Sequence, residues 1–128
     1  MDTLKHISRI AGALSDPGRA KVVLALKGRK LCICHIVELL GLSFPTVSRH
    51  ISILEAAGLI TTEKRGKWTY CSLPGREGEK AVLSAIRWLT STAAAAGIEE
   101  IEIPSIPAAV ERKAVCCAKK TKGIAEER

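Results

Sequence analysis

The chain has 128 residues, of which 47% are hydrophobic and 26% are charged, and its formal net charge is +7. A chain of this length fits one compact domain with a single core, which argues against two domains. No apolar run approaches the roughly 20 residues of a membrane helix, and the first residues lack the apolar core of a signal peptide, so we expect a cytoplasmic protein with no membrane partner.

The basic excess lies in the part of the chain that the sequence predicts to fold. Residues 1–97 contain 14 Lys and Arg against 7 Asp and Glu, a net charge of +7 (14 − 7). Because basic side chains that neutralise phosphates release condensed counterions, this charge favours a polyanionic partner. Only four aromatic residues are present, so the core must be aliphatic and we expect a mainly α fold.

Two helices are predicted at the start of the chain. Leu4, Ile7, Ala11 and Leu14 lie on one face of a helix. The pair at 16–17 is Asp-Pro, which is typical of a helix N-cap followed by a first-turn proline. The second helix therefore begins there, and a glycine at position 28 ends it.

The next two helices form a helix-turn-helix unit. An apolar stretch over residues 31–40 predicts a short third helix that ends at Gly41, and a fourth follows to about residue 57. The second helix of such a unit enters the DNA major groove, and an Arg there can pair with guanine, so Arg49 is the expected base-reading residue. His50 lies nearer the apolar stripe, where it either packs at the edge of the core or contacts a phosphate. The residues that we expect to contact DNA from this helix are Ser43, Pro45, Thr46, Ser48, Arg49, His50 and Ser52.

A β-hairpin is predicted after the fourth helix. Residues 59–64 and 67–73 read as two strands joined by a tight turn at Arg65-Gly66. The turn carries the basic side chains Lys64, Arg65 and Lys67. A basic wing directly after a recognition helix meets phosphates or the minor groove. Either feature alone would be read as a solvated charged surface, but the two together favour DNA binding.

The last predicted helix is strongly amphipathic, and a tail follows it. Apolar residues recur at helical spacing from Val82 to Ala96. Its small alanines permit close approach of another helix, and a complete winged unit leaves little core for it to cover, so we expect this helix to form a dimer interface. The predicted domains are a winged helix-turn-helix and dimerisation domain at 1–97 and an extended basic tail at 98–128 that contains Cys116 and Cys117.

Cys32-Ile33-Cys34 is the sharpest chemical signal in the chain. Thiolates are soft ligands, but free cysteines are also common core residues, and spacing alone favours the second interpretation. In a regular helix residues i and i+2 diverge by about 200°, so the pair would bind one ion only if the start of the third helix unwound. Adjacent thiols in the tail, Cys116 and Cys117, make poor core residues and could close over an ion. Cys71 is expected to pack in the second wing strand.

These motifs resemble the ArsR/SmtB family of metalloregulatory repressors. The resemblance covers roughly residues 1–97 and rests on the Leu-Cys-Ile-Cys segment at 31–34, the recognition helix "TVSRHISILEAAGLI" and the wing "KRGKWTYCSL". It implies a winged helix-turn-helix homodimer, formed through the first and last helices, that binds a palindromic double-stranded DNA operator and is released by an ion. Arsenic-sensing members share the Leu-Cys-x-Cys opening, so the resemblance implies As(III), with Sb(III) as a second candidate, bound by Cys32 and Cys34.

Alternatives to arsenic sensing follow from the same residues. A further cysteine found near the pair in some members is missing here, so Cys116 or Cys117, from either subunit, is the candidate third ligand. Zinc sensing through carboxylates and histidines of the interface helix is disfavoured, because residues 79–97 contain no His and one Glu. A repressor of the same fold that senses Cd, Pb, Zn or thiol oxidation is the main alternative. A thiol-redox enzyme is a weaker one, since the chain lacks a phosphate loop and an acid/base cluster.

Overall fold

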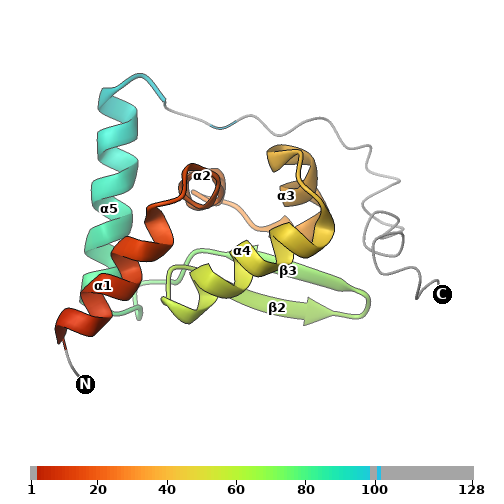
Figure 1. The fold of residues 1–128 in the computed structure, drawn as a ribbon, viewed down its shortest axis with the longest axis horizontal. Helices are drawn as coiled ribbons and strands as arrows, with labels where there is room; N and C mark the ends of the chain where they lie inside the picture. The colour runs from red at the N-terminus through yellow and green to blue at the C-terminus, as the bar shows by residue number, and fades with distance from the viewer. Residues whose placement is uncertain (1–2, 99–100, 102–128) are drawn as a thin grey trace.

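A computed structural model of the chain describes residues 3–98 and residue 101, and in this part it has five helices and three strands (Figure 1). The elements in chain order are α1 (Thr3–Leu14), α2 (Pro17–Ala25), β1 (Leu31–Cys32), α3 (Ile33–Leu40), α4 (Phe44–Ala56), β2 (Thr61–Arg65), β3 (Trp68–Ser72) and α5 (Lys80–Ala95). The fold is a winged helix-turn-helix, in which α3 and α4 form the helix-turn-helix and the β2–β3 hairpin is the wing. Sequence pattern had predicted this architecture.

The helix boundaries follow from local capping. Asp16 accepts a hydrogen bond from the backbone N–H of Arg19 at 3.2 Å, and α2 then begins at a proline. Ser43 caps α4 in the same way through the N–H of Thr46, at 3.4 Å. Gly41 ends α3 in the left-handed conformation, with φ of 67°, which costs glycine little. The caps predicted at Asp16 and Gly41 are confirmed.

The sheet contains one strand that the sequence did not predict. The strand order is β1-β3-β2, with antiparallel pairing throughout. In the β1–β3 ladder Leu31 pairs with Cys71, and Cys32 pairs with Tyr70. Because neighbouring residues of a strand face opposite sides, the first pair turns toward the main core and the second turns away from it. The third helix consequently begins at Ile33, two residues later than predicted.

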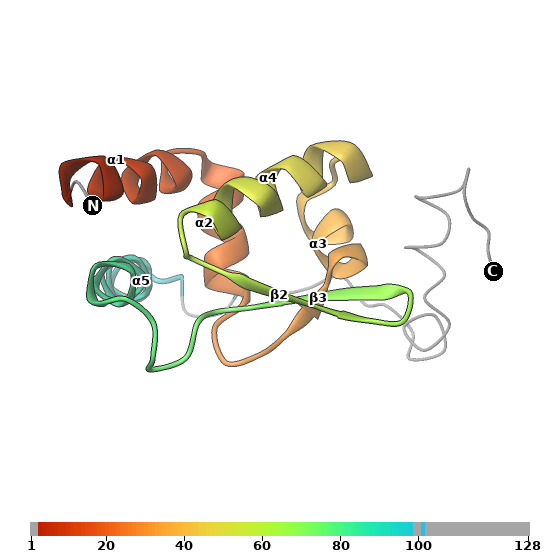
Figure 2. The ribbon, with the colours of Figure 1, turned by 90° about the horizontal axis from the view of Figure 1, so that it is seen from below.

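The main core lies between the helices and one face of the sheet. Its fully buried larger side chains are Val22, Val23, Leu26, Ile36, Val47, Leu54, Leu59, Ile60 and Val82. They come from α2, α3, α4, the chain entering β2 and the start of α5, so the recognition helix is held against the rest of the domain by its apolar side. Seen from below, α1 and α5 run next to each other at one end, and the hairpin extends toward the other (Figure 2).

No helix among the described residues combines the length and apolar character needed to cross a membrane. Of the predicted tail at 98–128, only Ile98 and Ile101 belong to the described residues. Arg29 donates a hydrogen bond to the carbonyl oxygen of Ile101 at 2.6 Å. Residue 101 therefore lies against the loop that leads into β1. The domain boundary at 97/98 stays a prediction.

Candidate thiolate site and nucleic-acid interface

Cys32 and Cys34 lie together at the beginning of α3. Cys32 is the N-cap residue, with an extended backbone (φ −70°, ψ 153°), whereas Cys34 is already helical. This change of conformation brings the two Sγ atoms to 3.1 Å, and the Cys34 N–H points at the Cys32 sulfur from 3.4 Å. Both residues are fully buried. The expectation that α3 must unwind before the thiols can meet is wrong, because Cys32 stands outside the helix.

The spacing of the two sulfurs suits a shared soft ion. Thiolates bonded to one ion at about 2.3 Å, the zinc–sulfur distance, lie roughly 3.3 to 3.8 Å apart for bond angles of about 90° to 110°. A separation of 3.1 Å needs only a small adjustment to reach this range. The positive end of the α3 dipole also favours negative charge at this position. The two sulfur atoms therefore lie close enough for both to contact one thiophilic ion.

His35 supports this geometry, a role that sequence reasoning missed. Its Nδ1 accepts a hydrogen bond from the backbone N–H of Cys32 at 3.1 Å, which completes a capping box with Cys32 as the cap residue. His35 is half-buried, whereas Glu38 on the same helix is exposed. The signal was present in the sequence as a cap residue followed three positions later by a side chain able to accept a hydrogen bond.

Aromatic side chains of the wing cover the cysteine pair. Trp68 and Tyr70 pack against Cys32 and Cys34 in a cluster separate from the main core. Their ring centroids are 6.2 Å apart, and the guanidinium carbon of Arg65 lies 5.6 Å from the Tyr70 ring centroid. The cysteine pair is thus in contact with the strand that carries the wing, as well as with the helix that precedes the recognition helix.

Cys71 lies apart from the cysteine pair. Cys71 is buried in the main core, as expected for a small strand residue, and burial, with a smaller effect of the Glu55 charge, raises the pKa of its thiol to about 12. Cys116 and Cys117 lie outside the described residues. Within residues 3–98 and 101, no group of three or more His, Cys, Asp or Glu side chains is arranged to hold a metal ion. The pair therefore needs ligands from elsewhere to form a three-coordinate site.

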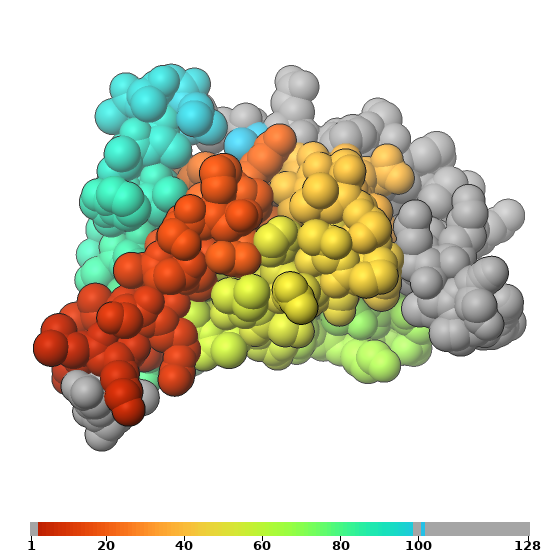
Figure 3. All heavy atoms as spheres, in the orientation of Figure 1, coloured from red at the N-terminus to blue at the C-terminus, as the bar shows by residue number. Residues whose placement is uncertain are grey.

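The outward side of α4 carries the predicted DNA-contacting residues. Its exposed members are Ser43, Pro45, Thr46, Arg49 and Ser52, and Ser48 is half-buried. Figure 3 shows atoms of α4 at the surface on the face that also carries α1 and α3. This helix presents one Arg and several hydroxyl groups, the side chains that read base edges and phosphates.

His50 turns away from this surface toward α2. Its Nδ1 lies 3.1 Å from Nη1 of Arg19, and its Nε2 lies 3.9 Å from Oδ2 of Asp16. The His50 side chain is 12% exposed. Of the two roles left open for His50, packing at the core edge agrees with this placement.

The wing presents the predicted basic side chains at its end. Lys64, Arg65 and Lys67 are exposed around the turn, where Gly66 adopts a φ of 64°. Nε of Arg65 lies 3.1 Å from a carboxylate oxygen of Glu63 on the same strand. Hydrogen bonds from Arg65 and then Lys30, helped by their charges, hold the pKa of Glu63 below its ordinary value. The Arg65 guanidinium is thereby held between Glu63 and the Tyr70 ring.

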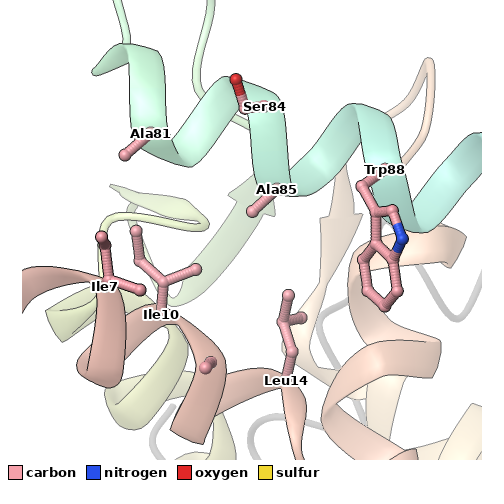
Figure 4. A pocket seen from close by; sticks show the side chains of 8 residues that line it. Ile7, Ile10, Leu14, Ala81, Ser84, Ala85 and Trp88 are labelled. Atoms are coloured by element: carbon pink, nitrogen blue, oxygen red, sulfur yellow. The ribbon is translucent and has the colours of Figure 1, made fainter.

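An apolar groove separates α1 from α5. It has a volume of about 440 Å³ and is lined by Ile7, Ile10, Ala11 and Leu14 of α1 and by Ala81, Ser84, Ala85 and Trp88 of α5. Figure 4 shows the α1 side chains and the alanines of α5 pointing toward one another across the groove. The exposed fractions are 47% for Ile7 and 61% for Trp88, which leaves large apolar surface uncovered at this end of the chain.

Fold and surface together define a winged helix-turn-helix regulator. Residues 16–62, which span α2 through the start of β2, match the model of the family described as "Bacterial regulatory protein, arsR family". An uncharacterised HTH-type transcriptional regulator of Methanocaldococcus jannaschii is 31% identical over 71 residues, which cover 55% of this chain and 80% of that protein. The arsenical resistance operon repressor of Escherichia coli K12 is 38% identical over 61 residues, 47% of this chain and 52% of that repressor. The chain belongs to the ArsR/SmtB family of transcriptional repressors, whose members are DNA-binding regulators and not enzymes.

Solved structures agree on the fold. HlyU from Vibrio cholerae N16961 superposes with a TM-score of 0.60 at 20% identity, covering 73% of this chain and 99% of that one. The homodimeric winged helix-turn-helix domain of Mb0332 from Mycobacterium bovis gives a TM-score of 0.58 at 21% identity, covering 72% and 83%. The thiol-redox enzyme considered from the sequence is therefore set aside on family membership.

Proposed function

We propose that the protein is a homodimeric repressor that binds a palindromic operator and leaves it when Cys32 and Cys34 capture As(III), with Sb(III) bound in the same way. The observation that carries the proposal is the 3.1 Å separation of the two buried sulfurs at the start of α3. Soft trivalent ions prefer thiolates to nitrogen and oxygen ligands, and this pair can bind one with little rearrangement.

A third thiolate would complete the pyramidal coordination that trivalent arsenic favours. We assign it to Cys116 or Cys117, from the same chain or from the partner subunit. The hydrogen bond between Arg29 and Ile101 supports this assignment, because it holds residue 101 at Arg29. Arg29 precedes Cys32 by three residues in the loop that leads into β1. Position 116 is fifteen residues after position 101, and an extended chain of that length spans up to about 50 Å.

DNA binding is assigned to the outward side of α4 and to the wing. The proposed contacts are Ser43, Pro45, Thr46, Ser48, Arg49, Ser52, Lys64, Arg65 and Lys67. Arg49 is exposed and reads a guanine, whereas the basic side chains of the wing contact backbone phosphates. The predicted contact of His50 with DNA is replaced here by a contact with Arg19.

Dimerisation is assigned to the groove between α1 and α5, with a second copy of the chain as its occupant. The lining is apolar, and the similar domain of Mb0332 is homodimeric. Alanines at 81 and 85 allow a helix of the partner to approach closely. This arrangement leaves α4 and the wing of each subunit open to DNA.

The wing supplies a second route by which the bound ion can weaken DNA binding. An ion between Cys32 and Cys34 lies against Trp68 and Tyr70, and Tyr70 holds Arg65 at the wing. Displacement of the aromatic rings would move Arg65 as well as α3. A coupling free energy of about 1 to 3 kcal/mol between the two sites is typical of allosteric proteins and is enough for release.

Operator release tests the proposal. Operator fragments would first be selected from random DNA, and binding would be followed by fluorescence anisotropy at fixed salt while arsenite is added. The double variant Cys32→Ser/Cys34→Ser should bind DNA as the wild type does but show no release, because both preorganised ligands are gone. Cys116→Ser/Cys117→Ser should need a higher arsenite concentration for the same release.

The matched control is Cys71→Ser, which removes a buried thiol from the core and should release normally. Parallel titrations with antimonite, cadmium, lead, zinc and a thiol oxidant separate the alternative inducers. Unchanged release by arsenite in the Cys32/Cys34 double variant would contradict the site. If only cadmium, or only the oxidant, released the operator, the assignment of the site would stand and the proposed inducer would be replaced.

A further inference from the structure

Arg19 joins three helices through one guanidinium group. Its Nε donates to the carbonyl oxygen of Ala13 at 2.8 Å, and its Nη2 donates to that of Gly12 at 3.4 Å. These carbonyls belong to the last turn of α1, where a cation is favoured, and that of Gly12 also accepts from the N–H and the hydroxyl of Ser15. The remaining arm, Nη1, lies 3.1 Å from Nδ1 of His50 on α4.

The contact with His50 has a defined direction. Arginine can only donate, so Nδ1 of His50 must accept and therefore carries no proton. The opposite nitrogen of the ring, Nε2, faces Asp16, the N-cap residue of α2, at 3.9 Å. His50 is thus oriented from both sides by residues of one α2 turn, and the neighbouring residue Arg49 projects to the surface.

We infer that Arg19 and His50 are positioning residues for DNA recognition, which fix the orientation of α4 relative to α1. The inference rests on the proposed function in one respect, namely that α1 lies at the dimer contact. Two recognition helices must meet half-sites about 34 Å apart, one turn of DNA. A link between the dimer helix and the recognition helix therefore sets which half-site spacing the dimer accepts.

A purely structural role would have a different signature. Loss of a hydrogen bond that only stabilises the fold lowers the free energy of unfolding and weakens binding to all sites alike. Loss of a positioning contact changes the preference between operators that differ only in spacing. The spacing preference is therefore the decisive measurement.

The test uses full-length Arg19→Met and His50→Leu, singly and combined, with His50→Gln as the conservative variant. Gln retains an oxygen that can accept from Arg19. Arg9→Met serves as the charge-matched control, because Arg9 is exposed on α1. Affinity is measured for the selected operator and for versions with one or two base pairs inserted between or deleted from its half-sites, and urea unfolding is followed in parallel.

Each single variant should lose about tenfold in affinity for the selected operator, in line with a hydrogen bond to a charged group. The loss of affinity for operators with altered spacing should be smaller, so the variants should discriminate less between spacings than the wild type does. The combined variant should lose less than the sum of the two single losses, since both single variants remove the Arg19–His50 contact. His50→Gln should retain the spacing preference, and Arg9→Met should keep it while losing some salt-dependent affinity.

Retention of the full spacing preference in Arg19→Met and His50→Leu, or strictly additive losses in the combined variant, would overturn the inference. If a variant does not fold, His50→Gln against wild type and Arg19→Lys still provide the comparison, because Lys cannot reach α1 and His50 at once. If the wild type selects only single half-sites, the dimeric part of the proposed function fails. Non-additive effects on half-site affinity would still support the Arg19–His50 contact, and additive effects would overturn it.

Discussion

The two faces of the small sheet hold cysteines in opposite chemical settings. On one face Leu31 and Cys71 pair across β1 and β3 and belong to the main core. On the other face Cys32 pairs with Tyr70, one residue further along each strand, and forms a separate cluster with Cys34. All three cysteines are fully buried. Burial therefore does not distinguish the proposed ligands from a core residue here, whereas a second nearby sulfur and a helix N-terminus do.

The largest expected effect concerns the core face. The pKa of Cys71 is raised from 9.0 to about 12, so below pH 9 its thiol is neutral in both the folded and the unfolded chain. Between pH 9 and 12 the unfolded chain loses the proton while the folded chain keeps it, and stability falls with rising pH. Relative to Cys71→Ala, the wild type should lose about 3 kcal/mol by pH 11.

Urea unfolding of both proteins at several pH values from 8 to 11 measures this difference. Tyr and Lys titrate in both proteins and cancel in the comparison. The wild type should be the more stable at pH 8, by about 1 to 2 kcal/mol for the lost side chain, and the less stable at pH 11. Two stability curves that stay parallel would show that Cys71 is not held neutral by the fold.

A smaller effect is expected at His35, which orients the other face. His35→Ala removes the acceptor for the Cys32 N–H and should raise the arsenite concentration for half-maximal release about five- to tenfold, as expected for a lost cap contact of about 1 kcal/mol. His35→Gln should restore most of the response, because Gln serves at this position of a capping box. Glu38→Ala, an exposed change on the same helix, is the control. Equal arsenite sensitivity in all variants would show that the hydrogen bond from Cys32 to His35 does not contribute to ion binding.

The smallest effect is expected at Tyr70, which joins the thiolate face to the wing. Tyr70→Leu removes the ring beneath Arg65, a cation–π contact of about 0.5 to 1 kcal/mol, and should reduce the arsenite-induced loss of operator affinity two- to fourfold. Tyr70→Phe keeps the ring and should respond as the wild type does. Anisotropy titrations with and without arsenite give this ratio directly. If Leu and Phe behave alike, the signal travels through α3 alone.

Much of the architecture could be predicted from the sequence because its signals are local. Asp16, Ser43 and Gly41 act within one helical turn, and the hairpin follows from its turn and its flanking strands. The amphipathic stripes of α1 and α5 likewise identified a face that the other described residues leave open. These features depend on residues near one another in the chain.

The thiolate site could be predicted only in part, because its arrangement depends on distant pairing. β1 has two residues, too few for a periodic pattern, and it is a strand only because β3 lies beside it. Without β1, Cys32 was placed inside the helix, where the two sulfurs would diverge. The contacts of Cys32 with Tyr70 and of His50 with Arg19 join residues more than thirty positions apart, and no local signal predicts them.

The separation of the two sheet faces has a consequence for how the proposed sensor can diversify. Cys32 and Cys34 pack with Trp68 and Tyr70 outside the main core, and the two cysteines and their capping histidine lie within positions 32–35. Changes at these three residues can alter the ion that the proposed site binds, while Ile33 between them keeps its place in the main core. A lineage could therefore exchange one inducer for another in a few substitutions while its operator contacts stay constant.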